Sequence, residues 1–123
     1  MKTDGRKVLG AIGEQAAVDY LQKHGFRIRE RNVRTRLGEI DIVAQDSETL
    51  VFVEVRTRRG GAFGTPEESI TFRKQWKLIQ LAESYIQTCG ESFQGYRIDV
   101  VVVEFSPSRV LQRVELIKNA IEA

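Results

Sequence analysis

Two acidic residues on neighbouring β-rich segments are the side chains of this sequence best suited to chemistry. Asp41 and Glu54 lie in two short β-rich runs separated by a polar stretch, a pattern that predicts a hairpin. If residues 46–49 form its loop, Asp41 lies directly opposite Glu54 on the same face. Like charges placed in this way repel each other, and a divalent cation would remove the repulsion. The spacing therefore predicts a metal site.

Oxygen ligands of this kind suit Mg²⁺ or Mn²⁺, and the backbone carbonyl of Val55 is a further candidate ligand. In phosphodiester hydrolysis such an ion activates water and polarises the phosphoryl oxygen. Arg56 shares the face of Glu54 under strand alternation, where it could hold a phosphate. The alternative is a structural ion pair between Arg56 and one of the two acids.

The elements that must position these residues follow from hydrophobic periodicity. The expected order is a helix over 7–24, an edge strand over 26–34, strands over 39–44 and 50–57, a loop over 58–64, a helix that starts near 65–68, a buried strand over 96–105, and a last strand over 110–117 followed by a helical turn. This order predicts an α/β fold with a mixed sheet packed against helices.

Both helices carry features that bear on the site. Gly10, Gly13 and Ala17 give the first helix a small-residue face that allows close approach to the sheet, and Glu14 lies at the edge of that face. The second helix is expected to begin with a cap, a proline and a glutamate at Thr65–Glu68 and to bury a stripe that includes Trp76. Phe63 precedes it in the glycine-rich loop, where we expect it to pack back onto the domain.

Composition limits the classes of protein that the chain can be. Its 123 residues, 41% of them hydrophobic, predict a single domain over 1–123. Cys89 is the only cysteine, so no intramolecular disulfide can form and a cytoplasmic location is expected. No apolar stretch approaches the length of a membrane span, so we expect no membrane association.

Basic residues gather in three parts of the chain although the net charge is only +2, so nucleic-acid binding must depend on local patches. They can be phosphate contacts or an ordinary solvated face, and next to a suspected phosphodiester site we favour phosphate contacts. The residues predicted to contact nucleic acid are Arg34, Arg36, Arg58, Arg59, Lys74 and Lys77.

Four motifs closely resemble a known bacterial family. They are Gly10–Ala17, Asn32–Arg34, Gly38–Val43 and Phe52–Arg58, and the similarity extends over about Gly10–Phe105. The family is the YraN-like group, uncharacterised protein family 0102. It resembles a branch of the PD-(D/E)XK restriction-endonuclease-like superfamily and is similar in outline to archaeal Holliday-junction resolvases.

The resemblance implies a role for each candidate site residue. Asp41 corresponds to the first metal-binding acid of the superfamily, Glu54 to the second, and Glu14 to a glutamate on the first helix of resolvase-like members. Arg56 takes the place of the usual lysine, and a guanidinium stays protonated, so it cannot accept a proton from water. Gln75 resembles a polar residue of the second helix that orients groups near the site, although an ordinary exposed position is the alternative.

These observations predict an Mg²⁺- or Mn²⁺-dependent DNA endonuclease that acts on branched or damaged DNA. Two alternatives stay open: a nucleic-acid-binding module that has lost turnover, for which Arg56 is the motivation, and a protein-interaction domain. Resolution of a junction requires two sites acting together, so the nuclease hypothesis also predicts a homodimer.

Overall fold

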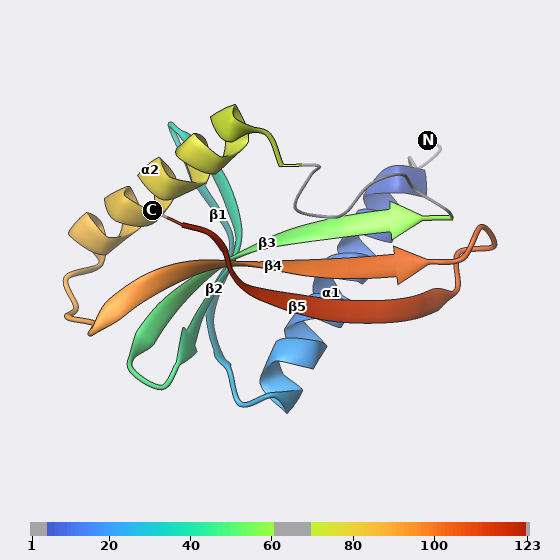
Figure 1. The fold of residues 1–123 in the computed structure, drawn as a ribbon, viewed down its shortest axis with the longest axis horizontal. Coiled ribbons are helices and arrows are strands. Elements are labelled where there is room, and N and C mark those ends of the chain that lie inside the picture. Colours follow the sequence, from blue (N-terminus) through green and yellow to red (C-terminus); the bar gives the residue numbers. More distant parts are fainter. Residues whose placement is uncertain (1–4, 61–69, 123) are drawn as a thin grey trace.

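A five-stranded sheet forms the centre of the molecule, and one helix covers each of its faces (Figure 1). The structure is a computed structural model that describes residues 5–60 and 70–122. Its elements in chain order are α1 (Gly5–Lys23), β1 (Arg27–Thr35), β2 (Gly38–Asp46), β3 (Thr49–Arg59), α2 (Phe72–Cys89), β4 (Gly95–Phe105) and β5 (Leu111–Ile121). The order of one helix, three strands, one helix and two strands is the one predicted from the sequence.

The strands lie side by side in chain order, from β1 at one edge to β5 at the other. Each neighbouring pair is antiparallel except β3 and β4, which are parallel. A parallel pair requires a long crossover connection, and α2 lies within the segment that joins these two strands. The crossover therefore brings α2 over the sheet face that carries Glu54.

Each face of the sheet has its own hydrophobic core. Successive residues of a strand point to opposite faces, so Val53 packs toward α1 and Phe52 packs toward α2. The small face of α1 lies close to β3, because a Cβ built on Gly13 would collide with Thr57 Oγ1. Ala17 is fully buried, whereas Gly10 has open space around it, so the predicted close approach is confirmed at Gly13 and Ala17 only.

The central hairpin confirms the predicted register. Gln45 pairs with Leu50 and Val43 pairs with Phe52. Asp46 and Thr49 are also paired, so the turn itself is shorter than the predicted loop, and Ser47 adopts a positive φ of 54° within it. The ladder ends at the pair Ile42–Val53, so the predicted pairing of Asp41 directly opposite Glu54 is not formed, although both residues line the same cavity.

Two predictions about the C-terminal half are wrong. Residues 118–121 continue β5 instead of forming a helical turn, because Ile121 pairs with Ile98 and is buried against the α2 face. Trp76 is 61% exposed. The buried side of α2 is set by Leu78, Leu81 and Ala82, and Trp76 lies about 200° around the helix from Leu78 at 3.6 residues per turn.

The start of α2 also differs from the expected one. The helix begins at Phe72, and Thr71 is its N-cap, with the side-chain oxygen accepting a hydrogen bond from the Lys74 backbone N–H. The predicted cap at Thr65–Glu68 and Phe63 lie outside the described residues. Gly90 ends the helix in the left-handed conformation. Neither described helix combines the length and the apolar character that a membrane span needs.

Candidate metal site

Asp41 lies at a break in the regular alternation of side chains along β1 and β2. Ile40 packs into the core under α2, while Ile42, two residues later, packs into the core under α1. Regular alternation would put both on one side. The break is matched in β1 by Asn32, whose φ is +53° and which lies between the paired residues Arg31 and Val33. Asp41 therefore belongs to neither regular face.

This break turns the Asp41 carboxylate toward the backbone of β3. The β2–β3 ladder ends at the pair Ile42–Val53, and Asp41 Oδ2 then accepts a hydrogen bond of 2.8 Å from the Val55 backbone N–H. In a strand, the N–H and C=O of one residue point to the same neighbouring strand. The carbonyl of Val55 is therefore directed toward the same side as the Asp41 carboxylate, which suits its predicted role as a ligand.

The surroundings of Asp41 oppose its ionisation. Burial, and the negative charge of Glu54 after it, raise the pKa of Asp41 from 3.8 to about 7, although the hydrogen bond from Val55 opposes the rise. Glu14 and Glu39 add smaller effects in the same direction. A carboxyl group with this pKa is half ionised near neutral pH, and a nearby cation would favour its charged form.

Glu54 lies on the face of β3 that α2 covers. Only 6% of the residue is exposed, and its Oε1 is 3.0 Å from the ammonium Nζ of Lys74 on α2. Asp41 and Glu54 line one cavity of about 290 Å³ together with Lys74 and Lys77. The cavity lies between the start of β2, the middle of β3 and the first turns of α2. Glu39 also lines it, so the cavity holds three carboxylates and two ammonium groups, and both kinds of charge suit a metal-bound phosphate.

Glu14 lies apart from this cavity. Its carboxylate accepts a hydrogen bond of 3.0 Å from the Asn32 side chain and lies 3.4 Å from Arg31 Nε. Within the described part of the chain, no group of three or more His, Cys, Asp or Glu side chains is arranged to hold a metal ion. The structure thus brings Asp41 and Glu54 together, while Glu14 acts on Asp41 through its charge and through Asn32 at the break in β1.

The other two predicted catalytic residues have different positions. Arg56 is half-buried and follows Glu54 by two residues, so alternation directs both to the α2 face. The side-chain amide of Gln75 donates a hydrogen bond of 2.9 Å to the Ile70 carbonyl. The backbone N–H of Gln75 donates to the Thr71 carbonyl. Gln75 therefore holds the chain at the start of α2 and does not line the cavity.

The remaining basic residues are dispersed. Arg34 and Arg36 are exposed near the β1–β2 turn, with Arg34 3.8 Å from Glu39. Arg58 lies 3.7 Å from Glu104, and Arg59 donates a hydrogen bond to the Pro107 carbonyl, so both lie at the far end of β3. Their contact with nucleic acid stays a prediction.

Arg29 of β1 is largely buried, paired with Glu91 at 2.7 Å and stacked over Phe93. Its position on an edge strand therefore does not make it available to a phosphate.

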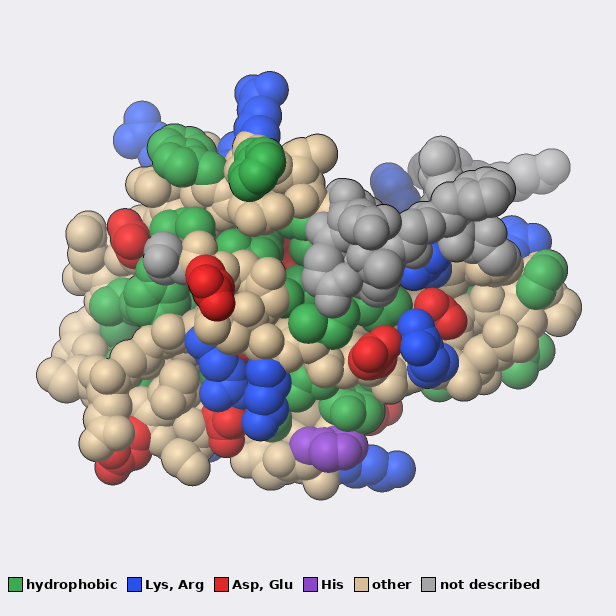
Figure 2. Space-filling view, in the orientation of Figure 1, with side chains coloured by type: hydrophobic (Ala, Val, Ile, Leu, Met, Phe, Trp, Pro, Cys, Tyr) green, Lys and Arg blue, Asp and Glu red, His purple; other side chains and the backbone are tan. Residues whose placement is uncertain are grey.

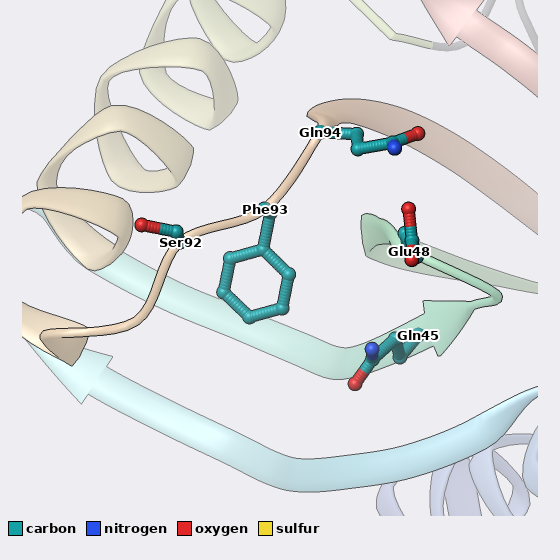
Figure 3. A pocket seen from close by; sticks show the side chains of 5 residues that line it. All are labelled: Gln45, Glu48, Ser92, Phe93 and Gln94. Carbon is teal, nitrogen blue, oxygen red and sulfur yellow. The ribbon is translucent and has the colours of Figure 1, made fainter.

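A second pocket, of about 350 Å³, offers a useful contrast (Figure 3). It is formed at the opposite ends of β2 and β3 by Gln45, Glu48, Ser92, Phe93 and Gln94. Glu48 is the only ionisable side chain among them. This pocket offers amide and hydroxyl groups around one aromatic ring, whereas the cavity at Asp41 concentrates charge.

Sequence reasoning missed two features of the site. Lys74 was predicted as a phosphate contact only, and its ion pair with Glu54 depends on a crossover geometry that no local pattern encodes. Asn32 was seen as part of a motif without a structural role. Asparagine is several-fold enriched at positive φ among non-glycine residues, so an asparagine inside a predicted strand was a readable signal for the break.

Comparison with known proteins places the sequence among close relatives. Residues 13–103 match the model of the family described as "Uncharacterised protein family UPF0102". A UPF0102 protein of Symbiobacterium thermophilum is 50% identical over 115 residues, 94% of this chain and 97% of the relative. A UPF0102 protein of Pelotomaculum thermopropionicum is 46% identical over 117 residues, 95% of this chain and 98% of the relative.

Proposed function

We propose that this chain, which belongs to the UPF0102 family as its four motifs predicted, is a metal-dependent nuclease that hydrolyses phosphodiester bonds in DNA. One observation carries the proposal. Two carboxylates, Asp41 and Glu54, line the same cavity with two ammonium groups, and burial together with mutual repulsion leaves Asp41 with a pKa of about 7. A divalent cation would stabilise the charged forms of both carboxylates in this arrangement.

The donor set fits Mg²⁺ or Mn²⁺. Asp41 and Glu54 would supply carboxylate oxygens and Val55 its carbonyl, all hard ligands that leave positions for water and phosphate. When bound, the ion would lower the pKa of a water molecule and polarise the scissile phosphate. The hydrogen bond from the Val55 N–H fixes the Asp41 carboxylate beforehand, so little rearrangement is needed to bind the ion.

Cationic side chains of the site have a separate task, because negative charge accumulates on the phosphate during hydrolysis. Lys74 and Lys77 line the cavity from α2, and Arg56 lies on the same sheet face as Glu54. A guanidinium binds phosphate through paired hydrogen bonds but does not accept protons at neutral pH. We therefore assign phosphate binding to Arg56 and give it no part in activating water.

Cleavage assays test the proposal directly. Labelled duplex DNA, single-stranded DNA and a four-way junction should be incubated with the protein and Mg²⁺ or Mn²⁺, with EDTA as the blank. Cleavage is expected with the metal, and Glu54→Gln should reduce it at least 100-fold, because the change removes a ligand charge while keeping the shape of the side chain.

Two controls make the result decisive. Glu115→Gln changes an exposed glutamate of β5 outside the cavity and should cleave like the wild type. Circular dichroism and thermal unfolding should show that both variants are folded. Equal cleavage by wild type and Glu54→Gln would mean a contaminating nuclease, and no metal-dependent cleavage of any of the three substrates would rule the proposal out.

A second function is favoured by one specific contact. The Lys74 ammonium is only 3.0 Å from Glu54, so the protein itself supplies a cation to that carboxylate. Together with Arg56 in the usual lysine position, this contact supports a nucleic-acid-binding module without turnover. Such a module would bind DNA in EDTA, lose affinity steeply with salt, and bind equally well as Glu54→Gln.

A further inference from the structure

The outer face of α2 carries two large aromatic side chains that belong to neither hydrophobic core of the described residues. Phe72 is 88% exposed and Trp76 is 61% exposed. They are four residues apart, so they are neighbours on the helix surface. Figure 2 shows hydrophobic side chains standing over α2 between Lys and Arg side chains. Keeping neighbouring large aromatic side chains in contact with water costs free energy, and such surfaces are typical of sites that bind a partner.

Their exposure does not arise from a shortage of core positions. The opposite side of α2 packs Leu78, Leu81 and Ala82 into the core between α2 and the sheet, so the helix already has a complete buried face. An ordinary amphipathic helix is polar on its other side. This helix instead carries Phe72 and Trp76 on a second side, which faces solvent.

Basic residues connect the aromatic pair with the cavity. At about 100° per residue, Lys74, Lys77, Arg73 and then Trp76 follow one another around α2 from the sheet to the outer surface. Lys74 and Lys77 line the cavity that holds Asp41 and Glu54, while Arg73 is exposed. An α-helix with its side chains is about 10–12 Å across, so the aromatic pair lies within a few nucleotides of the cavity.

We propose that Phe72 and Trp76 form a stacking platform for unpaired bases of single-stranded DNA whose backbone runs over Arg73 and Lys77 toward the cavity. The inference rests on the proposed function, because it defines the substrate class of the same site. Aromatic rings beside a basic track are the usual means of binding single strands without sequence preference. In base-paired DNA the faces of the bases are stacked on one another, so the platform selects single-stranded or branched DNA.

Trp76 is the only tryptophan, which makes the platform directly observable. Binding should be followed by tryptophan fluorescence in EDTA, with Glu54→Gln as the protein so that cleavage plays no part. An oligothymidylate should quench the fluorescence, and an abasic oligonucleotide of the same length should not. Equal responses to both would mean that the phosphates alone act on Trp76, and would overturn the platform.

Variants test the energetic contribution by fluorescence anisotropy of a labelled oligothymidylate. Phe72→Ala with Trp76→Ala should weaken binding about 5- to 100-fold for each stacked base and leave the salt dependence unchanged, because no charge is removed. Val110→Ala with Leu111→Ala is the matched control, since it shortens two exposed apolar residues next to and within β5. Unchanged binding by the α2 double variant would overturn the proposal.

Three further outcomes complete the test, and the last two separate this inference from the proposed function. If sedimentation shows that the α2 double variant dissociates a dimer while its affinity for DNA is unchanged, a second copy covers the aromatic pair and the platform is wrong. If metal-dependent cleavage needs Glu54 but the double variant binds and cleaves like the wild type, only the platform fails. If bases quench Trp76 and no metal supports cleavage, the platform stands and the proposed function fails.

Discussion

Two aspartates of this sheet each accept a hydrogen bond from a backbone N–H, but their neighbouring charges have opposite signs. Asp41 Oδ2 accepts from the Val55 N–H at 2.8 Å, and Asp99 Oδ1 accepts from the Asn119 N–H at 2.8 Å. Each lies at an interruption of a strand ladder, where a side chain takes the place of a backbone acceptor. Burial is the largest cause of a raised pKa in both.

Their charged neighbours differ. Asp99 is completely buried and binds Arg97 Nε with both oxygens, at 3.0 and 3.1 Å. The charges that act on Asp41 are negative, chiefly Glu54, and among the described residues no lysine or arginine forms an ion pair with it. Asp99 thus has its cation built into the fold, while the lysines that line the cavity at Asp41 form no ion pair with it among the described residues. This difference separates a structural carboxylate from one available to a ligand.

The largest expected effect comes from removing the cation of the structural site. Arg97→Met should lower the free energy of unfolding by about 3–5 kcal/mol at pH 8, because it leaves the Asp99 charge buried without a counterion. The loss should shrink in acid, where Asp99 takes up a proton and becomes neutral. Urea unfolding followed by circular dichroism at pH 8 and pH 4 measures both values.

A surface arginine provides the control for this change. Arg113 is exposed and pairs with Glu104 and Glu115, so Arg113→Met should cost less than about 1 kcal/mol. If Arg97→Met is equally mild, the two aspartates do not differ in the way described, and Asp99 is tolerated without its arginine.

Neutralising the other aspartate, Asp41, should raise the free energy of unfolding instead of lowering it. Asp41→Asn keeps an oxygen that can accept from the Val55 N–H and removes the repulsion from Glu54. In EDTA at pH 8 it should raise the free energy of unfolding by about 2–4 kcal/mol, since each pKa unit corresponds to about 1.4 kcal/mol. Destabilisation at pH 8 would contradict the raised pKa.

The pH dependence fixes the origin of this gain. The pKa of Asp41 is about 7 in the folded protein and near 3.8 when unfolded, so between these values the folded state holds a proton that the unfolded chain has released. The stability of the wild type therefore falls as pH rises through this range. The difference between Asp41→Asn and the wild type should be small below pH 4 and reach its maximum above pH 8. A gain that is constant with pH would have another cause.

The two aspartates also show how far sequence reasoning extends. The hairpin register and the closeness of Asp41 to Glu54 followed from alternation and the polar turn, because both are local properties. The ion pair of Lys74 with Glu54 was missed because it joins a helix and a strand through the crossover connection. The exposure of Trp76 was missed because its spacing fits an apolar stripe, and only tertiary packing decides which side of α2 is buried.

Divalent cations should act at one aspartate and not at the other. If Mn²⁺ binds at Asp41 and Glu54, a concentration 100 times the Kd stabilises the folded protein by about 2.7 kcal/mol. Thermal unfolding at pH 8 with and without Mn²⁺ should show this gain in the wild type and in Arg113→Met, and lose it in Asp41→Asn. Equal stabilisation of Asp41→Asn would mean that the ion binds elsewhere.

The smallest expected effect isolates the contribution of Glu54. Its charge is the second cause of the raised pKa of Asp41, after burial. In Glu54→Gln the carboxyl of Asp41 should therefore titrate at a lower pH, by the equivalent of about 1 kcal/mol. An NMR titration of the aspartate carboxyl carbons in EDTA measures this shift, with Asp99 as the internal reference because it lies in a different site. An unchanged titration of Asp41 would show that burial alone raises its pKa. The argument that Asp41 and Glu54 act together as metal ligands would then lose its support.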